Sequence, residues 1–172
     1  INTIDTAFVY GDLFSMLSEQ IYLSDIRIVT KFSVLDNYAD LYNKIEKLYS
    51  TYKLQSIYGL LVHDPQNLSK IDSAHLKTFL DSVRSSGLVS KTGISAYDMH
   101  EVKIFQELMP TDLVQIPLNP LNQRFNCNEF KDFVLENNIE VHARSLFLQG
   151  ILLATQLPES LQTLGPIWQR FQ

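Results

Sequence analysis

Short apolar runs rich in β-branched residues recur along this chain and alternate with longer stretches of helical periodicity. Six runs predict strands: Asn2–Ala7, Arg27–Lys31, Ile57–His63, Thr92–Ser95, Leu113–Pro117 and Glu140–Ala143. Ile57–His63 (IYGLLVH) is almost continuously apolar, which is typical of a strand buried on both faces of a parallel sheet. The gaps between runs suit the crossovers that parallel strands need, although the gap from Gly11 to Ile28 is short for a helix with two loops. The pattern therefore predicts an α/β domain of repeated βα units.

Apolar positions at helical spacing predict a helix in each of the longer stretches after the second run. The predicted helices are Tyr38–Tyr52, Ser73–Ser86, Asp98–Leu108, Asn128–Glu136 and Pro158–Phe171. Asp98 and Asn128 are cap-type residues at the start of two of them, and Gly87 is expected just after the end of another. The last helix contains Gly165 and Pro166, near which we expect a break.

Composition excludes several classes of protein. With 172 residues, a formal net charge of -5 and no block of Lys or Arg, the chain is long enough for one domain and lacks the basic surface of a nucleic-acid binder. The lone cysteine, Cys127, has no partner at metal-ligand spacing, so we expect an inert thiol, no metal site and a reducing cytoplasm. No run approaches 18 apolar residues, and no membrane span is expected.

Polar residues end nearly every predicted strand. They are Asp5, Lys31, His63, Ser95, Gln115, Arg144 and Ser145. A doubly wound nucleotide-binding sheet would need a glycine-rich turn of the form G-x-G-x-x-G or G-x-x-x-x-G-K-[ST], and the six glycines form neither. A (β/α)8 barrel instead gathers residues from all its strand ends on one face. The polar strand ends therefore favour a TIM barrel.

Only six strands are visible, whereas a closed barrel of this kind needs eight. We therefore expect residues 1–172 to form a single barrel domain that lacks the first strand and the last strand with its cofactor-phosphate loop. The chain also opens inside a strand without an initiator methionine, which is typical of a fragment or of a chain with parts left out.

Six blocks of the sequence, in this order, resemble the aldo-keto reductase family. The blocks read IDTAFVYG, VTKF, LLVHDP, GLVSKTGISAYD, VQIPLNPLNQRF and ARSLFLQGILL, and together they run from about residue 1 to residue 154. The resemblance implies an NAD(P)H-dependent oxidoreductase that reduces an aldehyde, ketone or sugar carbonyl. The last block is similar to that of bacterial members linked to surface-polysaccharide metabolism, which favours a sugar.

The resemblance assigns a catalytic tetrad to Asp5, Tyr10, Lys31 and His63. Tyr10 would be the general acid that protonates the carbonyl oxygen, and Lys31 would lower its pKa, which is about 10 in a free tyrosine. Asp5 would pair with Lys31 and hold it in place. His63 would form a hydrogen bond with the substrate carbonyl and orient it.

The resemblance also assigns residues to the cofactor, NADPH or NADH. Ser95 and Gln115 match the residues that hold the nicotinamide carboxamide, but Ala96 stands where the family has an asparagine. Arg144 stands in place of the aromatic residue that stacks on the nicotinamide ring, and a planar guanidinium can also stack. The loop that would lie along the pyrophosphate contains Ser145, Leu146, Gln149 and Gly150.

Two other functions remain open from the sequence. The first is a non-catalytic NADPH-binding regulatory or accessory protein on the same barrel, which the loss of the asparagine at Ala96 favours. The second is a dehydratase or isomerase that uses Lys31 as a base or Schiff-base nucleophile. The remaining histidines, His75, His100 and His142, have no metal-ligand spacing and are expected on the surface or in a strand.

Overall fold

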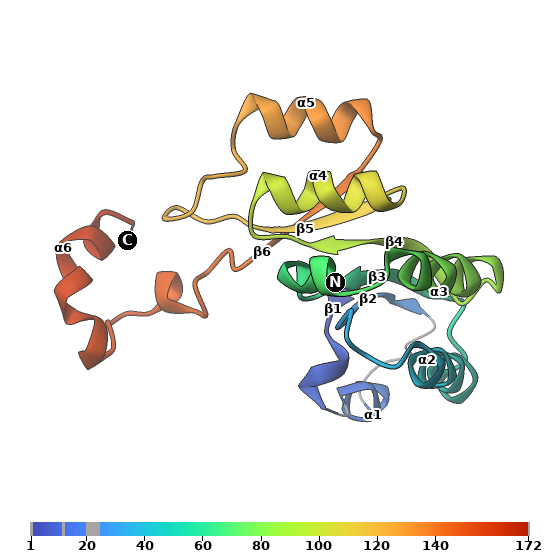
Figure 1. Ribbon diagram of the computed structural model, residues 1–172. Coiled ribbons are helices and arrows are strands. Elements are labelled where there is room, and N and C mark those ends of the chain that lie inside the picture. The colour runs from blue at the N-terminus through green and yellow to red at the C-terminus, as the bar shows by residue number, and fades with distance from the viewer. Residues whose placement is uncertain (1, 12, 20–24, 172) are drawn as a thin grey trace.

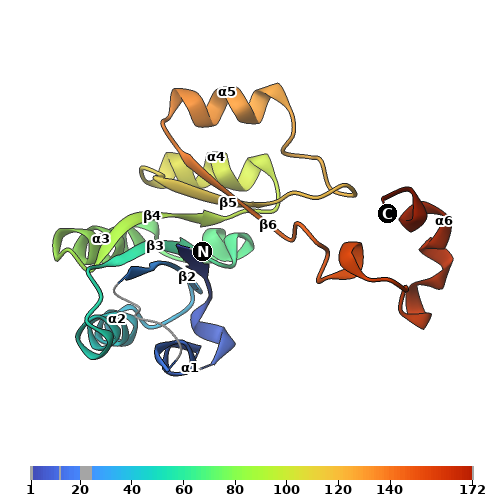
Figure 2. The same cartoon turned by 180° about the vertical axis from the view of Figure 1, so that it is seen from behind.

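The computed structural model describes residues 2–11, 13–19 and 25–171, and its six strands form one parallel sheet. In sheet order they are β1 (Thr3–Asp5), β2 (Arg27–Phe32), β3 (Ile57–Val62), β4 (Val89–Ser95), β5 (Leu113–Pro117) and β6 (Glu140–Arg144). Every neighbouring pair is parallel and adjacent in the sequence. Figures 1 and 2 show the sheet curving, with helices along its outer side. This half-barrel confirms the predicted α/β class and the incomplete (β/α)8 barrel.

Apart from α1, which was not predicted, the helices follow the predicted order. They are α1 (Leu13–Ser18), α2 (Tyr38–Tyr52), α3 (Ser73–Ser85), α4 (Met99–Leu108), α5 (Asn128–Glu136) and α6 (Gly165–Trp168). Short 3-10 helices are η1 (Phe8–Tyr10), η3 (Pro65–Lys70), η4 (Ile151–Leu153), η5 (Glu159–Leu164) and η6 (Gln169–Phe171). Asp98 caps α4 in a capping box with Glu101, and Gly87 follows α3 with a φ of 76°, both as predicted.

Some boundaries differ from the sequence prediction. Strand β4 begins at Val89, three residues before the predicted Thr92, because its first residues still pair with β3. Cys127, not Asn128, is the N-cap of α5, and its side chain makes no capping hydrogen bond. The predicted helix Pro158–Phe171 is instead η5, α6 and η6 in succession. Pro166 lacks a backbone N–H, which removes one hydrogen bond that a continuous helix would use there.

Alternation along β2 decides which side chains face the inside of the half-barrel. Ile28 packs in the large core between the sheet and the helices, whereas Val29 packs with Leu61 and Leu113 in a small cluster of its own. Lys31 is two residues beyond Val29 and therefore points to the same face. The inner face thus carries both the small apolar cluster and the charged end of β2.

Toward the N-terminal ends of the strands, this inner face carries an ionic cluster around Glu140. Its carboxylate accepts hydrogen bonds from the Lys91 ammonium, from the Tyr58 hydroxyl at 2.6 Å, and interacts with His142 Nε2 at 2.7 Å. Burial acts to raise the pKa of Glu140, but the hydrogen bonds from Lys91, Tyr58 and His142 outweigh it and lower that pKa to about 2. The inside of the barrel is therefore held by charge pairing as well as by apolar packing.

Two features lie outside the sheet. The segment from η4 to η6 stands away from the strands in both ribbon views (Figures 1 and 2), and the Trp168 indole N–H donates to the Ile151 carbonyl at 3.0 Å.

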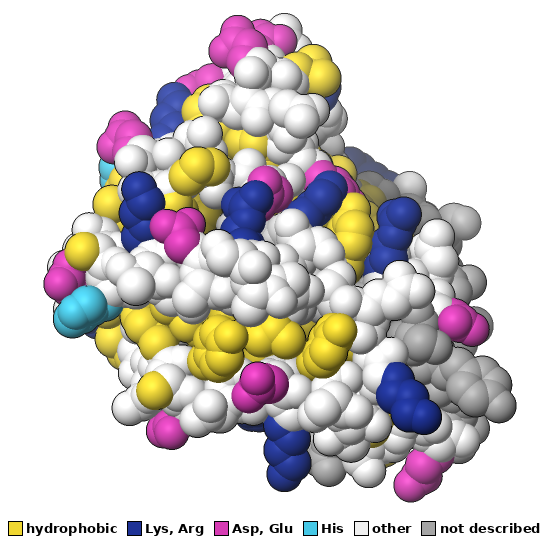
Figure 3. Space-filling model, turned by 90° about the vertical axis from the view of Figure 1, so that its right-hand side faces the viewer, with side chains coloured by type: hydrophobic (Ala, Val, Ile, Leu, Met, Phe, Trp, Pro, Cys, Tyr) yellow, Lys and Arg dark blue, Asp and Glu magenta, His cyan; other side chains and the backbone are white. Residues whose placement is uncertain are grey.

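On the outer side of the sheet, an apolar groove lined by Tyr38, Tyr42 and Phe79 runs between α2 and α3 (Figure 3). Within the described part of the chain, no helix has the length and apolar character needed to cross a bilayer.

Candidate active site

A cavity of about 250 Å³ opens at the C-terminal ends of the strands. Its lining contains Asp5, Tyr10, Lys31, His63, Ser95, Tyr97, Gln115, Arg144 and Ser145. The structure therefore brings the four predicted tetrad residues together with four of the predicted cofactor residues. The other three, Leu146, Gln149 and Gly150, lie in the following loop and do not line the cavity.

Lys31 is the buried charge of the site, with only 2% of its surface exposed. Its Nζ donates to both carboxylate oxygens of Asp5, at 2.7 and 2.8 Å, and to the Thr6 carbonyl at 2.8 Å. Burial lowers the pKa of Lys31, and the hydrogen bond and charge of Asp5 act in the opposite direction. A buried ammonium is costly unless it is paired. Asp5 and the Thr6 carbonyl supply that pairing, and β1 and β2 bring them together.

A chain of side-chain hydrogen bonds extends from this ion pair across the sheet. Gln115 Nε2 donates to Asp5 Oδ1 at 2.9 Å, and Ser95 Oγ donates to Gln115 Oε1 at 3.3 Å. Both Ser95 and Gln115 are 2% exposed. The sequence predicted these two residues only as cofactor ligands. Because Gln115 also donates to the carboxylate that holds Lys31, the residues predicted for catalysis and those predicted for the cofactor form one hydrogen-bond network.

Tyr10 and His63 lie at the mouth of the cavity. Tyr10 is 58% exposed, and its ring meets the His63 ring edge-on with centroids 6.0 Å apart. Lys31 Nζ is 5.9 Å from the centroid of the Tyr10 ring. Burial and then the Lys31 charge lower the pKa of His63 from its ordinary value of 6.5, which favours the neutral form of its imidazole. A phenol, an ammonium and an imidazole thus share one cavity.

Asp64 secures the loop beside His63, and sequence analysis missed it. Its carboxylate accepts hydrogen bonds from the Ser33 hydroxyl at 2.7 Å and from the Val34 N–H at 2.9 Å. The Asn67 amide donates to it at 2.8 Å. The His63 N–H also donates to the Phe32 carbonyl at 2.8 Å. These bonds fix the segments that follow β2 and β3, and so fix the backbone that carries His63. The sequence did contain a signal for this role, because Asp64 is an acidic residue directly after His63, which ends a predicted strand.

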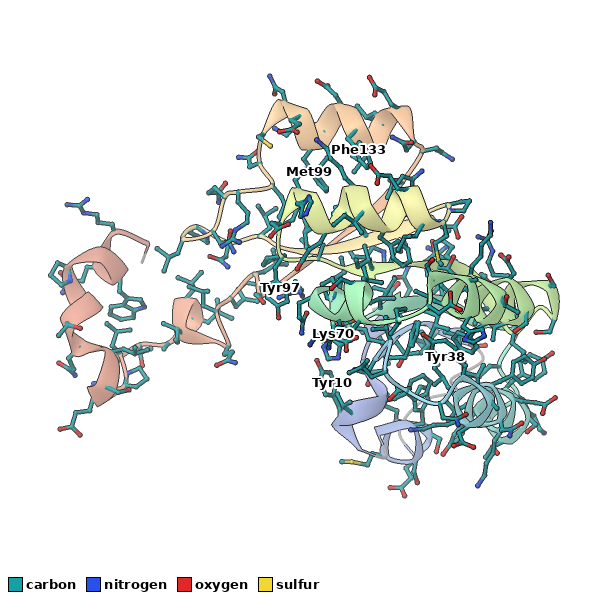
Figure 4. The ribbon with its side chains drawn as sticks, in the orientation of Figure 1. Tyr10, Tyr38, Lys70, Tyr97, Met99 and Phe133 are labelled. Carbon is teal, nitrogen blue, oxygen red and sulfur yellow. The ribbon has the colours of Figure 1, made fainter. Side chains whose placement is uncertain are left out.

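Arg144, the last residue of β6, stacks on Tyr97. Its Cζ lies 4.3 Å from the centroid of the Tyr97 ring, and Nη1 lies 3.5 Å from Ser145 Oγ. Its Nε and Nη2 are buried and have no hydrogen-bond partner among the described residues. Figure 4 shows Tyr97 and Tyr10 at the same end of the sheet. Tyr97 was not predicted, although it follows the strand-end Ser95 by two residues.

The loop after Arg144 has an unusual backbone. Ser145, Leu148 and Gln149 adopt positive φ values of 59°, 48° and 57°, and Gly150 follows at 90°. Left-handed backbone is uncommon in residues other than glycine, so this loop has a defined and costly conformation. Ala96, where the resemblance expects an asparagine, is fully buried and has no polar side-chain atom.

Comparison with known proteins identifies the family. The model of the Aldo/keto reductase family matches residues 1–163. No curated protein sequence matched the chain.

Solved structures with a similar fold share few identical residues with the chain. An aldo-keto reductase from Bacillus halodurans is 19% identical, with a TM-score of 0.71 over 92% of this chain and 56% of its own. A glycerol dehydrogenase from Gluconobacter oxydans is 21% identical, with a TM-score of 0.66 over 93% of this chain and 55% of its own. An aldo-keto reductase solved as a complex with NADPH is 20% identical, with a TM-score of 0.63 over 98% of this chain and 58% of its own. The chain thus spans less than two thirds of the length of these structures. It belongs to the aldo/keto reductase family.

Proposed function

We propose that this chain carries the active site of an NAD(P)H-dependent reductase of aldehyde, ketone or sugar carbonyls. One observation supports this most strongly: the buried Lys31–Asp5 ion pair lies in the same cavity as Tyr10 and His63. The reduction needs three groups from the protein: a general acid, a charge that lowers the pKa of this acid, and a group that orients the carbonyl.

In this proposal each side chain has a distinct role. Tyr10 donates its phenolic proton to the carbonyl oxygen as the carbonyl carbon is reduced. The Lys31 ammonium near the Tyr10 ring stabilises the phenolate that remains, and Asp5 keeps that ammonium charged and in place. The neutral imidazole of His63 donates an N–H to the same oxygen and orients it. Three acceptors around Lys31 Nζ support a fixed cation in preference to a Schiff-base nucleophile.

The residues present fit a nicotinamide cofactor in part. NADPH or NADH, when bound, supplies the hydride. Ser95 presents a buried hydroxyl at the cavity and Gln115 a buried amide, and a nicotinamide carboxamide needs such hydrogen-bond partners. Arg144 and Ser145 add donors beside them, whereas Ala96 offers none. The family relative solved with NADPH favours that cofactor. Leu146, Gln149 and Gly150 remain proposed for the pyrophosphate on the basis of the sequence resemblance.

We extend the proposal to domain organisation and location. Residues 1–172 form one barrel domain, and further strands pair with the edge strands β1 and β6. The six-stranded sheet and the shorter span of the chain relative to similar structures support this. The single free cysteine, Cys127, is consistent with a reducing cytoplasm.

The direct test is NADPH consumption by the full-length protein with a panel of aldehydes, ketones and sugars. We expect turnover by the wild type and a loss of about 100-fold or more in kcat for Tyr10→Phe, with NADPH binding retained, because a general acid contributes about 10² to 10⁴ in rate. Tyr49→Phe, which removes an exposed hydroxyl on α2, is the matched control and should keep wild-type turnover. Equal kcat for Tyr10→Phe and wild type would exclude Tyr10 as the acid.

The alternative is an accessory protein that binds NADPH without turnover. Buried Ala96 favours it, because one contact to the carboxamide is missing. Binding of NADPH without turnover on any substrate of the panel would support this reading. Binding of neither NADPH nor NADH would remove both proposals.

A further inference from the structure

Resting on the proposed reductase function, we propose that Asp64 is a positioning residue for the reduction, which sets the place of His63 relative to the substrate carbonyl. The two residues are neighbours in the chain, yet His63 lines the catalytic cavity and Asp64 does not. The carboxylate therefore acts on the reaction through its neighbour, by fixing the backbone that the two residues share.

The side chain of Asp64 continues the pairing of β2 with β3 at the point where the backbone ladder stops. The His63 N–H donates to the Phe32 carbonyl at 2.8 Å, one residue beyond the end of β3. A continued parallel ladder would next pair the Val34 N–H with the His63 carbonyl. That N–H instead donates to Asp64 Oδ1 at 2.9 Å. The carboxylate thus holds the two strand ends together where they begin to separate.

The other carboxylate oxygen strengthens the same tie. The Ser33 hydroxyl donates to Asp64 Oδ2 at 2.7 Å, and the Asn67 amide donates to the same oxygen at 2.8 Å. The carbonyl of Val34 is bound as well, because the Tyr38 hydroxyl donates to it at 2.9 Å. Hydrogen bonds to a carboxylate are stronger than those between neutral groups. The segment after β2 is therefore tied to the end of β3 by the carboxylate and to α2 by the tyrosine.

This tie joins the two strand ends that carry reacting groups. Lys31 is two residues before Ser33, and His63 directly precedes Asp64. The His63 ring meets the Tyr10 ring edge-on with centroids 6.0 Å apart, so a shift of this backbone moves the imidazole relative to the general acid. A displacement on the order of 1 Å in a group that positions the substrate can cost about 10² in rate.

The test is reduction by the full-length protein, with the member of the substrate panel that the wild type turns over fastest. Asp64→Ala removes the acceptor of all three hydrogen bonds. Asp64→Asn keeps an acceptor for the Val34 N–H and gains an amide that can donate to the Ser33 hydroxyl, so it loses the bond from Asn67 and the charge. The readouts are kcat, KM and the Kd for NADPH.

We expect Asp64→Ala to lower kcat by about 10- to 100-fold with an unchanged Kd for NADPH, because the displaced imidazole no longer orients the carbonyl. Asp64→Asn should stay within about threefold of the wild type, because it keeps two of the three bonds. Asp72→Ala is the matched control: Asp72 also accepts from a backbone N–H, that of Ala74, but as the N-cap of α3. Its kcat should equal that of the wild type.

Dependence on His63 separates positioning from general stability. In a His63→Gln background, Asp64→Ala should cause no further loss of kcat, because the group that it positions is already gone. If Asp64→Ala does not fold, Ser33→Ala replaces it in the same comparison, since it removes the 2.7 Å bond alone.

Three results would overturn the inference. The first is wild-type kcat in Asp64→Ala. The second is the same loss of kcat with and without His63, which would assign Asp64 to the stability of the fold. The third is an equal loss in Asp64→Asn and Asp64→Ala, which would assign the effect to the charge of the carboxylate.

Absence of all turnover would instead count against the proposed reductase. NMR of the His63 and Tyr10 rings then decides the positioning role separately. We expect a nuclear Overhauser contact between the two rings in the wild type and in Asp72→Ala, and a weaker contact in Asp64→Ala. Equal contacts in all three proteins, or no contact in the wild type, would remove the inference.

Discussion

At the scale of single residues, the Lys31–Asp5 pair is asymmetric. The Lys31 side chain is 2% exposed, whereas that of Asp5 is 43% exposed. Water can therefore hydrate Asp5 when its partner is removed, but it cannot reach Lys31 in the same way. The two partners should have different effects on stability when each is replaced.

We expect Asp5→Asn to lower the free energy of unfolding by about 1 to 3 kcal/mol, because it leaves a buried ammonium without its counterion. Lys31→Met removes the buried charge and keeps most of the side-chain volume, so it should stay within about 1 kcal/mol of wild type. Both variants should lose reductase activity. Urea unfolding at pH 7 measures the difference, and an equal or larger cost for Lys31→Met would contradict this account.

His63 should titrate below its ordinary value of 6.5, because burial and then the Lys31 charge lower its pKa. As the pH falls through 6.5, the unfolded chain takes up the proton before the folded protein does. The stability that neutral His63 contributes is thus present above pH 6.5 and is lost as the pH falls toward its folded pKa. NMR titration, assigned with His63→Gln, measures the pKa directly. Lys31→Met should raise it, and an unchanged value would exclude the Lys31 contribution.

At the scale of elements, Gly93 on β4 leaves no room for a side chain against its partner Leu113 on β5. A Cβ at this position would lie 1.7 Å from the Leu113 carbonyl oxygen, whereas at Gly59 the nearest atoms are side-chain carbons of Val29 at 3.4 Å. Gly93 is two residues before Ser95, so this contact also sets the position of the hydrogen bond from Ser95 to Gln115.

Gly93→Ala should therefore destabilise the protein by about 3 kcal/mol or more, since only backbone movement can relieve the clash. Gly59→Ala is the matched control within the same sheet and should cost less than about 1 kcal/mol, because the new methyl group makes ordinary contacts. The midpoints of urea unfolding give both values. Similar midpoints for the two variants would show that β4 and β5 can separate at little cost.

At the scale of the whole molecule, the Glu140 cluster joins strands that are not neighbours in the sheet. It connects β6 to Lys91 on β4 and to Tyr58 on β3, across the inside of the curve. These contacts favour the curvature that brings Asp5, on β1, close to Gln115, on β5.

Because the folded pKa of Glu140 is about 2, below its ordinary value of 4.5, the stability that its carboxylate contributes is present above pH 4.5 and is lost as the pH falls toward 2. The carboxylate is partly exposed, so we expect about 1 to 2 kcal/mol after allowance for solvent screening. Glu140→Gln should be less stable by this amount at pH 7 and should converge with wild type near pH 2. Urea unfolding of both proteins at a series of pH values between 2 and 7 measures this difference in stability. A difference that stays constant from pH 7 to pH 2 would contradict the lowered pKa of Glu140.

Much of the fold could be predicted from the sequence, because strand and helix signals are local. The apolar runs located all six strands, and the Asp98 cap located the start of α4. The prediction of Asn128 as the N-cap of α5 was wrong, because Cys127 occupies that position and its side chain makes no capping hydrogen bond. The helix predicted from Pro158 to Phe171 is interrupted at Gly165, where a break was expected, but the parts on either side are short 3-10 and α-helical turns that apolar periodicity did not predict.

The sequence by itself determined which residue types end the strands, because alternation and strand length are local properties. Together with the family resemblance, those types predicted a carbonyl-reducing site at Asp5, Tyr10, Lys31 and His63. Only the tertiary structure decided their partners: Gln115 reaches Asp5 across 110 residues, and Tyr58 reaches Glu140 across 82. Such contacts depend on the curvature of the sheet, which no local pattern encodes. The same curvature placed Arg144 beside Tyr97 and left one edge of its guanidinium free.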